Sequence, residues 1–253
     1  MKPLTRHLWR GFGLLVLCGV ALQLTFALRI AGMNLLAPES TAFQRSEAWR
    51  LLTQTASLPW RQDWVDYERI SANLKRAVIA SEDAAFTDHA GVDWESIEKA
   101  WERNQRAEAR AEKLNERAAA RPAAKAKLVE PKVVGGSTIT QQLAKNLFLS
   151  GERTVLRKGQ EFLLTFMLEA LLSKQRILEI YLNNVEWGEG VFGAQAAARH
   201  YFRVDAAQLG AYQAARLAVM LPAPKRFEKR PGSAYVSGRA GTIVARMGAV
   251  ALP

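Results

Sequence analysis

The chain has 253 residues, of which 49% are hydrophobic and 23% are charged, so it can bury a large core and does not have the composition of a disordered protein. Lys and Arg outnumber Asp and Glu by 35 to 24, which favours an anionic partner: nucleic acid, a phosphorylated substrate or an acidic membrane surface. The single cysteine, Cys18, excludes an internal disulfide and a cysteine-based zinc site, and the three scattered histidines argue against a metal cage.

An apolar segment, GFGLLVLCGVALQLTFAL, occupies residues 11–28, and Gln23 is its one strongly polar residue. Its length is close to the roughly 20 residues that a helix needs to cross the hydrocarbon core of a bilayer. A buried core helix is the alternative, but the segment has no amphipathic pattern. The segment therefore predicts a transmembrane helix. Of the anionic partners considered above, this prediction favours the acidic membrane surface.

The charges on the two sides of this segment predict its orientation. Three basic residues precede it closely: Lys2, Arg6 and Arg10. Arg29 alone follows closely, so the positive-inside rule places the N-terminus in the cytoplasm. No small-x-small cleavage site ends the segment cleanly. We therefore predict an uncleaved anchor over residues 1–36 and an extracytoplasmic domain over residues 37–253.

A second pattern predicts a helix that ends at two adjacent carboxylates, Glu82 and Asp83. Apolar residues recur at helical spacing before them: Ile70, Leu74, Ala77 and Val78. The stretch SEDAAFTDHAG then contains a glycine and reads as a turn. Turns of this kind often present reactive groups, so the two carboxylates are candidates for chemistry.

Another helix is predicted to begin near Asp93 and to continue through Trp101 into WERNQRAEARAEKLNERAAARPAAKAK. This stretch lacks a sustained apolar stripe, so we expect a solvated helix that ends at Pro122, followed by a flexible basic linker. A nucleic-acid-binding arm is the alternative. We disfavour it because no aromatic residue interleaves the charges after Trp101.

The segment GGSTITQQLAKNLFL, residues 135–149, has the pattern of a helix start, because Thr138 and Gln141 fit a capping box after a glycine turn. We expect free N–H groups here, which would form an anion site. Gln141, Gln142 and Lys145 would extend this polar surface along one helical face. A well-capped helix with a polar outer side and no ligand is the simpler alternative.

The next segment, RTVLRKGQEFLLTFMLEALLSKQRILEIYLNN, is predicted to form core helices, because charges interrupt it too often for a membrane span. Arg157, Lys158 and Glu161 lie close together on one helical face, where an exposed ion pair is the alternative to a site. Glu161 directly precedes the apolar FLL, and Gly159 lowers helix stability by about 1 kcal/mol. Both observations favour a site.

Residues 188–193, GEGVFG, match the pattern of a dinucleotide-binding loop. We reject this assignment because the preceding ILEIYLNN reads as a helix and no strand–helix–strand context is visible. We expect a tight turn before the helix AQAAARHYF instead. Few alternating strand patterns occur, so the predicted fold class is mainly α.

Five segments in this order resemble the monofunctional biosynthetic peptidoglycan glycosyltransferases: EDAAFTDHAGVDW, GGSTITQQLAKNLFL, RKGQE, KQRILEIYLN and GEGVFGAQAAARHYF. They cover about half of the chain beyond the anchor. The resemblance implies a lysozyme-like, mainly helical fold that polymerises lipid II on the outer face of the cytoplasmic membrane. The stretch between Trp101 and Val134 is longer than the usual connection in the family, so its local structure is not implied.

The resemblance also implies roles for individual residues. Glu82 matches the general base that takes the proton of the acceptor hydroxyl, and Glu161 matches the second glutamate, which orients the basic residues at the pyrophosphate. Further residues are expected to bind the sugar and pyrophosphate groups: Ser137, Thr138, Gln141, Gln142, Lys145, Asn146, Arg153, Arg157, Lys158 and Lys174. His89 is expected to shape the turn after Glu82.

Lipid II, the growing glycan strand and membrane lipids are the expected partners, together with other cell-wall synthesis proteins; nucleic acid is not. We assign no cofactor and no metal ligand, and leave open a divalent cation at the pyrophosphate. Two alternatives remain. A lytic enzyme would cut glycan strands but would not need the basic cluster, and an envelope scaffold would have no catalytic activity.

Overall fold

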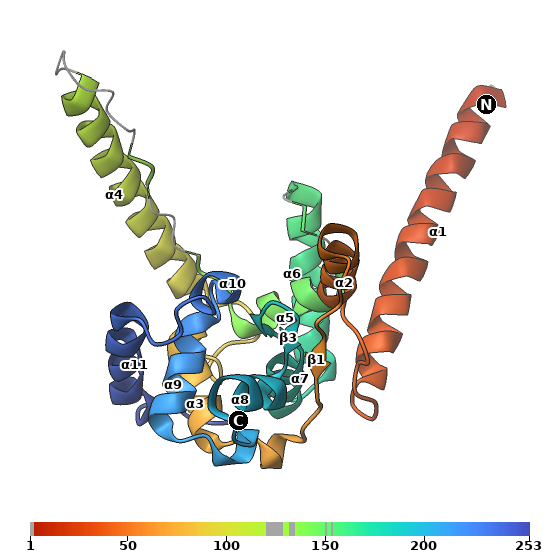
Figure 1. The fold of residues 1–253 in the computed structure, drawn as a ribbon. Coiled ribbons are helices and arrows are strands. Elements are labelled where there is room, and N and C mark those ends of the chain that lie inside the picture. Colours follow the sequence, from red (N-terminus) through yellow and green to blue (C-terminus); the bar gives the residue numbers. More distant parts are fainter. Residues whose placement is uncertain (1–2, 120–128, 132–134, 150, 153) are drawn as a thin grey trace.

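The computed structural model describes residues 3–119, 129–131, 135–149, 151–152 and 154–253. Helices dominate this part of the chain, which confirms the predicted mainly α class (Figure 1). Helix α4 (Trp94–Ala119) and the N-terminal part of α1 (Pro3–Gly32) extend away from the body as separate arms, while the C-terminal part of α1 contacts α6. The body contains α2 (Ala42–Thr55), α3 (Ala72–Glu82), α5 (Ile139–Phe148), α6 (Val155–Leu171), α7 (Lys174–Asn184), α8 (Ala194–Phe202), α9 (Ala211–Met220), α10 (Pro224–Phe227) and α11 (Ala234–Met247), with short 3-10 turns at Tyr67–Arg69 and Ala206–Gln208.

Two groups of helices form the core. Helices α3, α9 and α11 pack against one another, and α5 packs against α6 and α7. The apolar residues that predicted α3, including Leu74, Ala77 and Val78, are fully buried. The helix ends at Glu82 with Asp83 as its C-cap, so the predicted end of this helix is confirmed.

A small sheet lies against the helices, in the order β1-β3-β2. Strand β1 (Arg61–Gln62) is parallel to β3 (Val191–Phe192), and β2 (Glu186–Gly188) is antiparallel to it. Gly190 makes the turn between β2 and β3 with φ of 71°. The glycine motif therefore forms a tight turn after helix α7, which confirms that it is not a dinucleotide-binding loop.

Helix α1 contains the segment His7–Gly32, which is long and apolar enough to cross a membrane. Its large apolar side chains are exposed, as at Leu15 and Leu28, and this agrees with the predicted membrane anchor. Ile30 and Met33, at its C-terminal end, are buried against the body. The predicted boundary at residue 36 falls between α1 and α2 and stays a prediction.

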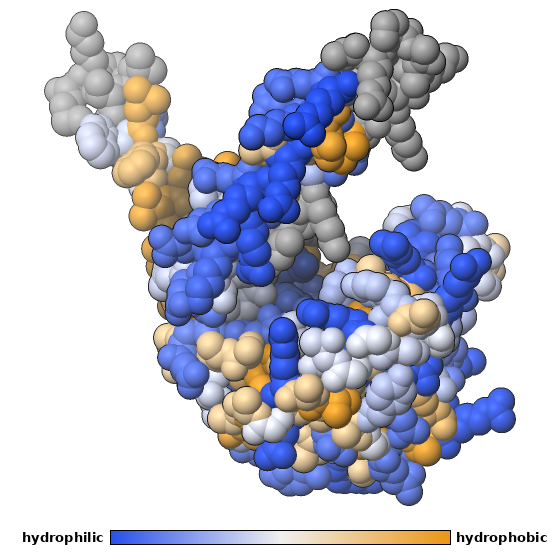
Figure 2. All heavy atoms as spheres, turned by 90° about the vertical axis from the view of Figure 1, so that its left-hand side faces the viewer, coloured by the Kyte–Doolittle hydropathy of each residue, from blue (hydrophilic) through white to orange (hydrophobic). Residues whose placement is uncertain are grey.

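Helix α4 begins at Trp94, close to the predicted start. Its surface is largely hydrophilic, as expected for a solvated helix (Figure 2). The side chain of Asn115 donates a hydrogen bond to the carbonyl oxygen of Val129 and accepts one from its N–H, at 3.1 and 2.8 Å, so the chain returns alongside the helix. Pro122 and most of the predicted basic linker lie outside the described residues.

Candidate active site

Asp83 fixes the turn that presents Glu82. One oxygen of this buried carboxylate lies 2.8 Å from Nε2 of His89, and the other accepts a hydrogen bond of 2.9 Å from the backbone N–H of Ile139. Nδ1 of His89 accepts a hydrogen bond from the N–H of Gly91, so Nε2 carries the proton that is donated to Asp83. These bonds join the end of α3 to the start of α5, and they give His89 the structural place that we predicted.

Polar side chains surround Glu82 on the other side of this turn. The amide nitrogen of Gln142 donates a hydrogen bond to Glu82 at 3.2 Å, and the Ser81 hydroxyl donates another at 3.3 Å. The Tyr181 hydroxyl donates to the amide oxygen of Gln142 at 2.9 Å, which orients this amide. Burial raises the pKa of Glu82 and the charge of Asp83 adds to the rise, against the two hydrogen bonds, which lower it. The result is a carboxylate that is a stronger base than that of an ordinary glutamate.

The start of α5 is capped as predicted, but some of the backbone N–H groups that we expected to be free are already hydrogen-bonded. The hydroxyl oxygen of Thr138 accepts from the N–H of Gln141, whose side chain accepts from the N–H of Thr138 in return. The expectation of free N–H groups is wrong for Ile139 and Gln141, since Asp83 already binds the first and Thr138 the second. The anion at this helix start is thus a carboxylate of the chain itself.

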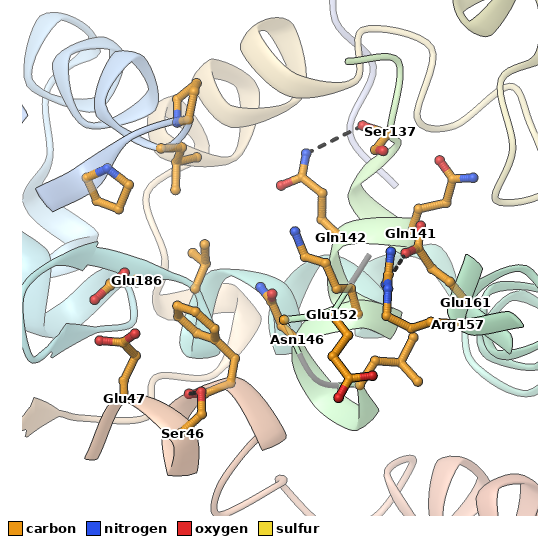
Figure 3. A pocket seen from close by; sticks show the side chains of 18 of the residues that line it. Ser46, Glu47, Ser137, Gln141, Gln142, Asn146, Glu152, Arg157, Glu161 and Glu186 are labelled. Atoms are coloured by element: carbon orange, nitrogen blue, oxygen red, sulfur yellow. Dashed lines mark hydrogen bonds and ion pairs between the residues drawn. The ribbon is translucent and has the colours of Figure 1, made fainter. Parts of the chain in front are cut away.

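A cavity of about 620 Å³ opens beside Gln142, and one end of it is cationic (Figure 3). Arg157 pairs with one oxygen of the buried Glu161 at 2.8 Å, and Lys158 pairs with the other oxygen. The i+3 and i+4 spacings on α6 bring these side chains together. Lys145 enters the same end from α5. Glu152 also lines this end, so three cations and two carboxylates leave a net positive charge there.

Two observations indicate that this end is prepared for an anion. Nε of Arg157 is buried, and no hydrogen-bond partner for it is present among the described residues. Desolvation by the cavity walls lowers the pKa of Lys145; Glu161 opposes this effect, and the charges of Arg157 and Lys158 add to it. A phosphate group would supply the missing acceptor and relieve the repulsion between the cations.

Two carboxylates that sequence reasoning missed line the opposite end of the cavity, Glu47 on α2 and Glu186 on β2 (Figure 3). Lys225 pairs with Glu47 and lies 3.5 Å from Glu186. Burial raises the pKa of Glu186 to about 7 against the effect of Lys225. The signal for Glu186 was its position between the apolar residues Val185 and Trp187. Nothing in the sequence around Glu47 indicated that it would lie opposite the cationic end of the cavity.

The remaining predicted site residues fall into three groups. Ser137, Gln141 and Asn146 line the cavity, while Glu82 is linked to it through Gln142. Two predicted binding residues, Thr138 and Lys174, do not line it. Thr138 is buried and donates to the carbonyl of Gly91, and Lys174 pairs with Glu169 over the ring of Phe86. Arg153 lies outside the described residues.

The cationic end does not offer a set of metal ligands. Each oxygen of Glu161 already pairs with a cation. Within the described ranges, no cluster of three or more His, Cys, Asp or Glu side chains is arranged to hold a metal ion. The residues present therefore fit an anion better than a divalent cation, and we derive no step through a metal.

Comparison with known proteins gives the family. The chain matches the family described as Transglycosylase over residues 50–113 and 114–248. The chain belongs to the transglycosylase family. The two matched stretches meet inside α4. This is the region in which we expected a longer connection than is usual in the family. The match includes α5 and α6, which carry the cationic end of the cavity, whereas Glu47 precedes it.

Curated relatives within the transglycosylases agree with this assignment. Proteins named biosynthetic peptidoglycan transglycosylase from Burkholderia thailandensis and Burkholderia pseudomallei are each 50% identical over 92% of this chain and 83% of their own length. One with the same name from Paraburkholderia xenovorans is 50% identical over 92% of this chain and 88% of its own. The similarity therefore extends over more than four fifths of each of these relatives.

Proposed function

We propose that this transglycosylase polymerises lipid II into peptidoglycan glycan strands by inverting transfer, with release of undecaprenyl pyrophosphate. The observation that carries the proposal is the arrangement of Glu82, a half-buried carboxylate of raised pKa, next to a cavity whose cationic end contains Lys145, Arg157 and Lys158. The names of the curated relatives support the same reaction.

In this mechanism, Glu82 is the general base. It takes the proton of the acceptor 4-hydroxyl while the oxygen of that hydroxyl bonds to C1 of the donor sugar. The bond from C1 to the pyrophosphate oxygen breaks on the opposite face, and its electrons leave with the lipid pyrophosphate. Gln142 orients the carboxylate through its hydrogen bond to Glu82, and it is itself held by Tyr181. An alcohol is a weak nucleophile, so a positioned base contributes about 10² to 10⁴ in rate.

The cationic end of the cavity stabilises the leaving group. Arg157 and Lys158 neutralise the charge that develops on the pyrophosphate oxygens, and Lys145 approaches from the neighbouring helix. Glu161 orients the first two through its ion pairs. Ser137 and Asn146 supply neutral hydrogen-bond donors on the same surface. We keep Arg153 as a further candidate for this anion site.

The anchor helix gives the expected location. With α1 in the cytoplasmic membrane and Arg10 on its inner side, the catalytic domain lies outside the cytoplasm, where a lipid-linked substrate reaches it from the bilayer. Membrane lipids contact the exposed apolar surface of α1. Other cell-wall synthesis proteins are further expected partners.

A lytic enzyme is the nearest alternative function, since it too uses a glutamate at a glycosidic bond. It would cut an uncharged linkage and would have no use for the cations around Glu161. An envelope scaffold would not need a carboxylate of raised pKa beside a cavity. The cationic end therefore favours transfer from a pyrophosphate donor.

The test is to incubate the detergent-solubilised protein with labelled lipid II and to separate the products on a gel. A ladder of lengthening glycan is the expected result. Purified glycan strands are incubated in parallel. Cleavage of these strands without a ladder would move the assignment to the lytic alternative. The absence of both a ladder and cleavage would favour the scaffold.

A further inference from the structure

A reciprocal pair of amides joins the anchor helix to the catalytic domain. The amide nitrogen of Gln23 donates to the amide oxygen of Gln160 at 2.9 Å, and the amide nitrogen of Gln160 donates back at 3.1 Å. Gln23 is the one strongly polar residue in the apolar segment, and Gln160 lies on α6 directly before Glu161. An amide left unpaired in an apolar environment is costly, so each side chain satisfies the other.

The anchor and the residues directly after it also contact the body at positions that follow Gln23 in the chain. The rings of Phe26 and Phe148 meet edge to face at 5.3 Å, and the amide of Asn34 donates to the carbonyl of Leu171 at 2.9 Å. Arg176 donates to the carbonyl of Met33 at 2.7 Å. The part of the anchor from Gln23 onward is therefore held by α5, α6 and α7 together.

We infer that α1 is a positioning element and not a flexible tether. The Gln23–Gln160 pair holds α1 against α6 near the outer edge of the bilayer and so fixes the position of the cavity relative to the membrane. Gln23 lies five residues before the end of the apolar segment at Leu28, which is about 7.5 Å along a helix. Arg157 and Lys158 lie within one turn of Gln160 on the same helix, so a fixed anchor also fixes the cationic end.

This arrangement suits a substrate that is itself held in the bilayer. A lipid-linked pyrophosphate lies at the level of the headgroups. If the cavity has a fixed position relative to the bilayer, the catalytic domain can bind this group without changing its depth or tilt. Pre-organisation of this kind lowers the cost of binding the substrate and does not act on the chemical step. We therefore assign the Gln23–Gln160 pair a positioning role. Its effect on substrate binding rests on the proposed function.

The first test measures docking of the anchor without using activity. Cys18→Ser removes the native thiol, and Ala27→Cys with Met167→Cys places two thiols in the groove between α1 and α6. We expect a short bismaleimide to cross-link these positions in the full chain in membranes. Gln23→Leu or Gln160→Leu should each lower the yield about 3- to 10-fold, the effect of one or two interhelical hydrogen bonds in a bilayer.

Two further variants sharpen this result. The double variant Gln23→Leu with Gln160→Leu leaves no amide unpaired, so its loss should be smaller than the product of the two single losses. Thr25→Leu is the matched control, because the Thr25 hydroxyl donates to the Ala21 carbonyl of its own helix and, within the described ranges, to no residue of the body. An unchanged yield in both single variants, or an equal loss in Thr25→Leu, would overturn the proposal.

The second test separates positioning from general damage. In proteoliposomes, Gln23→Leu should lower kcat/KM for lipid II about 3- to 10-fold through KM, while the rate with a short-chain substrate in detergent stays at the wild-type value. An equal loss in both systems would contradict a positioning role. A protein with no polymerase activity would still give the cross-linking result, so failure of the proposed function is distinguishable from failure of this inference.

Discussion

The environment of a single carboxyl group, that of Glu82, sets the expected pH dependence of the enzyme. Its pKa is raised from 4.5, chiefly by burial, so the carboxylate form that accepts a proton is lost at a higher pH than for an ordinary glutamate. We expect the acid limb of the kcat/KM profile to lie above pH 4.5. Gln142→Leu removes a hydrogen bond that favours the carboxylate, and should move the limb higher still. A limb at or below 4.5 in the wild type would contradict this assignment.

Glu186 gives a prediction for stability. Its pKa is about 7 in the folded protein against an ordinary 4.5, so the protonated form contributes stability that is complete below about pH 4.5 and is lost as the pH rises through 7. The full difference is about 3 kcal/mol. Glu186→Gln should remove this dependence, so thermal unfolding of the variant should change less between pH 5 and 8. The exposed Glu68 serves as the control in Glu68→Gln; equal slopes in wild type and Glu186→Gln would refute the prediction.

At the scale of elements, the turn between β2 and β3 depends on one glycine. Gly190 has φ of 71°, and a Cβ there would lie 1.7 Å from the carbonyl oxygen of Pro59. Gly190→Ala should therefore lower the free energy of unfolding by about 2–4 kcal/mol by pushing β1 away from β3. Gly238→Ala, in open space inside α11, should stabilise the protein by about 0.5–1 kcal/mol. Equal denaturation midpoints for the two variants would contradict this explanation.

Local patterns were sufficient to predict several of the helices, among them α3 and α5, whereas α2 and α9 to α11 were not predicted individually. The spacing of Leu74, Ala77 and Val78 gave α3 and its end, and Thr138 with Gln141 gave the start of α5, because both signals lie within a few residues. The occupied N–H of Ile139 was not predictable in this way. The carboxylate of Asp83 that accepts its hydrogen bond lies 56 residues earlier in the chain, and only the tertiary fold brings the two together.

The same limit applies to the cavity. Its cationic end was predictable because Arg157, Lys158 and Glu161 are neighbours on one helix. Its acidic end combines Glu47 from α2 with Glu186 from β2, so no single segment carried the signal. The resemblance assigned Lys174 to the substrate, but the fold turns this side chain toward Glu169.

At the scale of the whole molecule, the two arms have different expected roles. Helix α1 is docked on the catalytic body from Gln23 onward, whereas the distal part of α4 extends away from it (Figure 1). Asn115 and Val129 are hydrogen-bonded to each other, so a short Gly/Ser loop can replace residues 116–128 without moving either end. We expect this replacement to leave the rate of polymerisation within about twofold of wild type and thermal unfolding little changed. A loss of polymerisation in a folded variant would show that the arm takes part in substrate binding.

The account of the whole molecule depends on Glu82 as the base of a polymerase. The most direct test is the initial rate of glycan formation from lipid II by Glu82→Gln, beside wild type and the exposed control Glu68→Gln. We predict a loss of about 10² to 10⁴ for Glu82→Gln, with unchanged thermal unfolding and a control at the wild-type rate. A Glu82→Gln rate within tenfold of wild type would contradict the central claim.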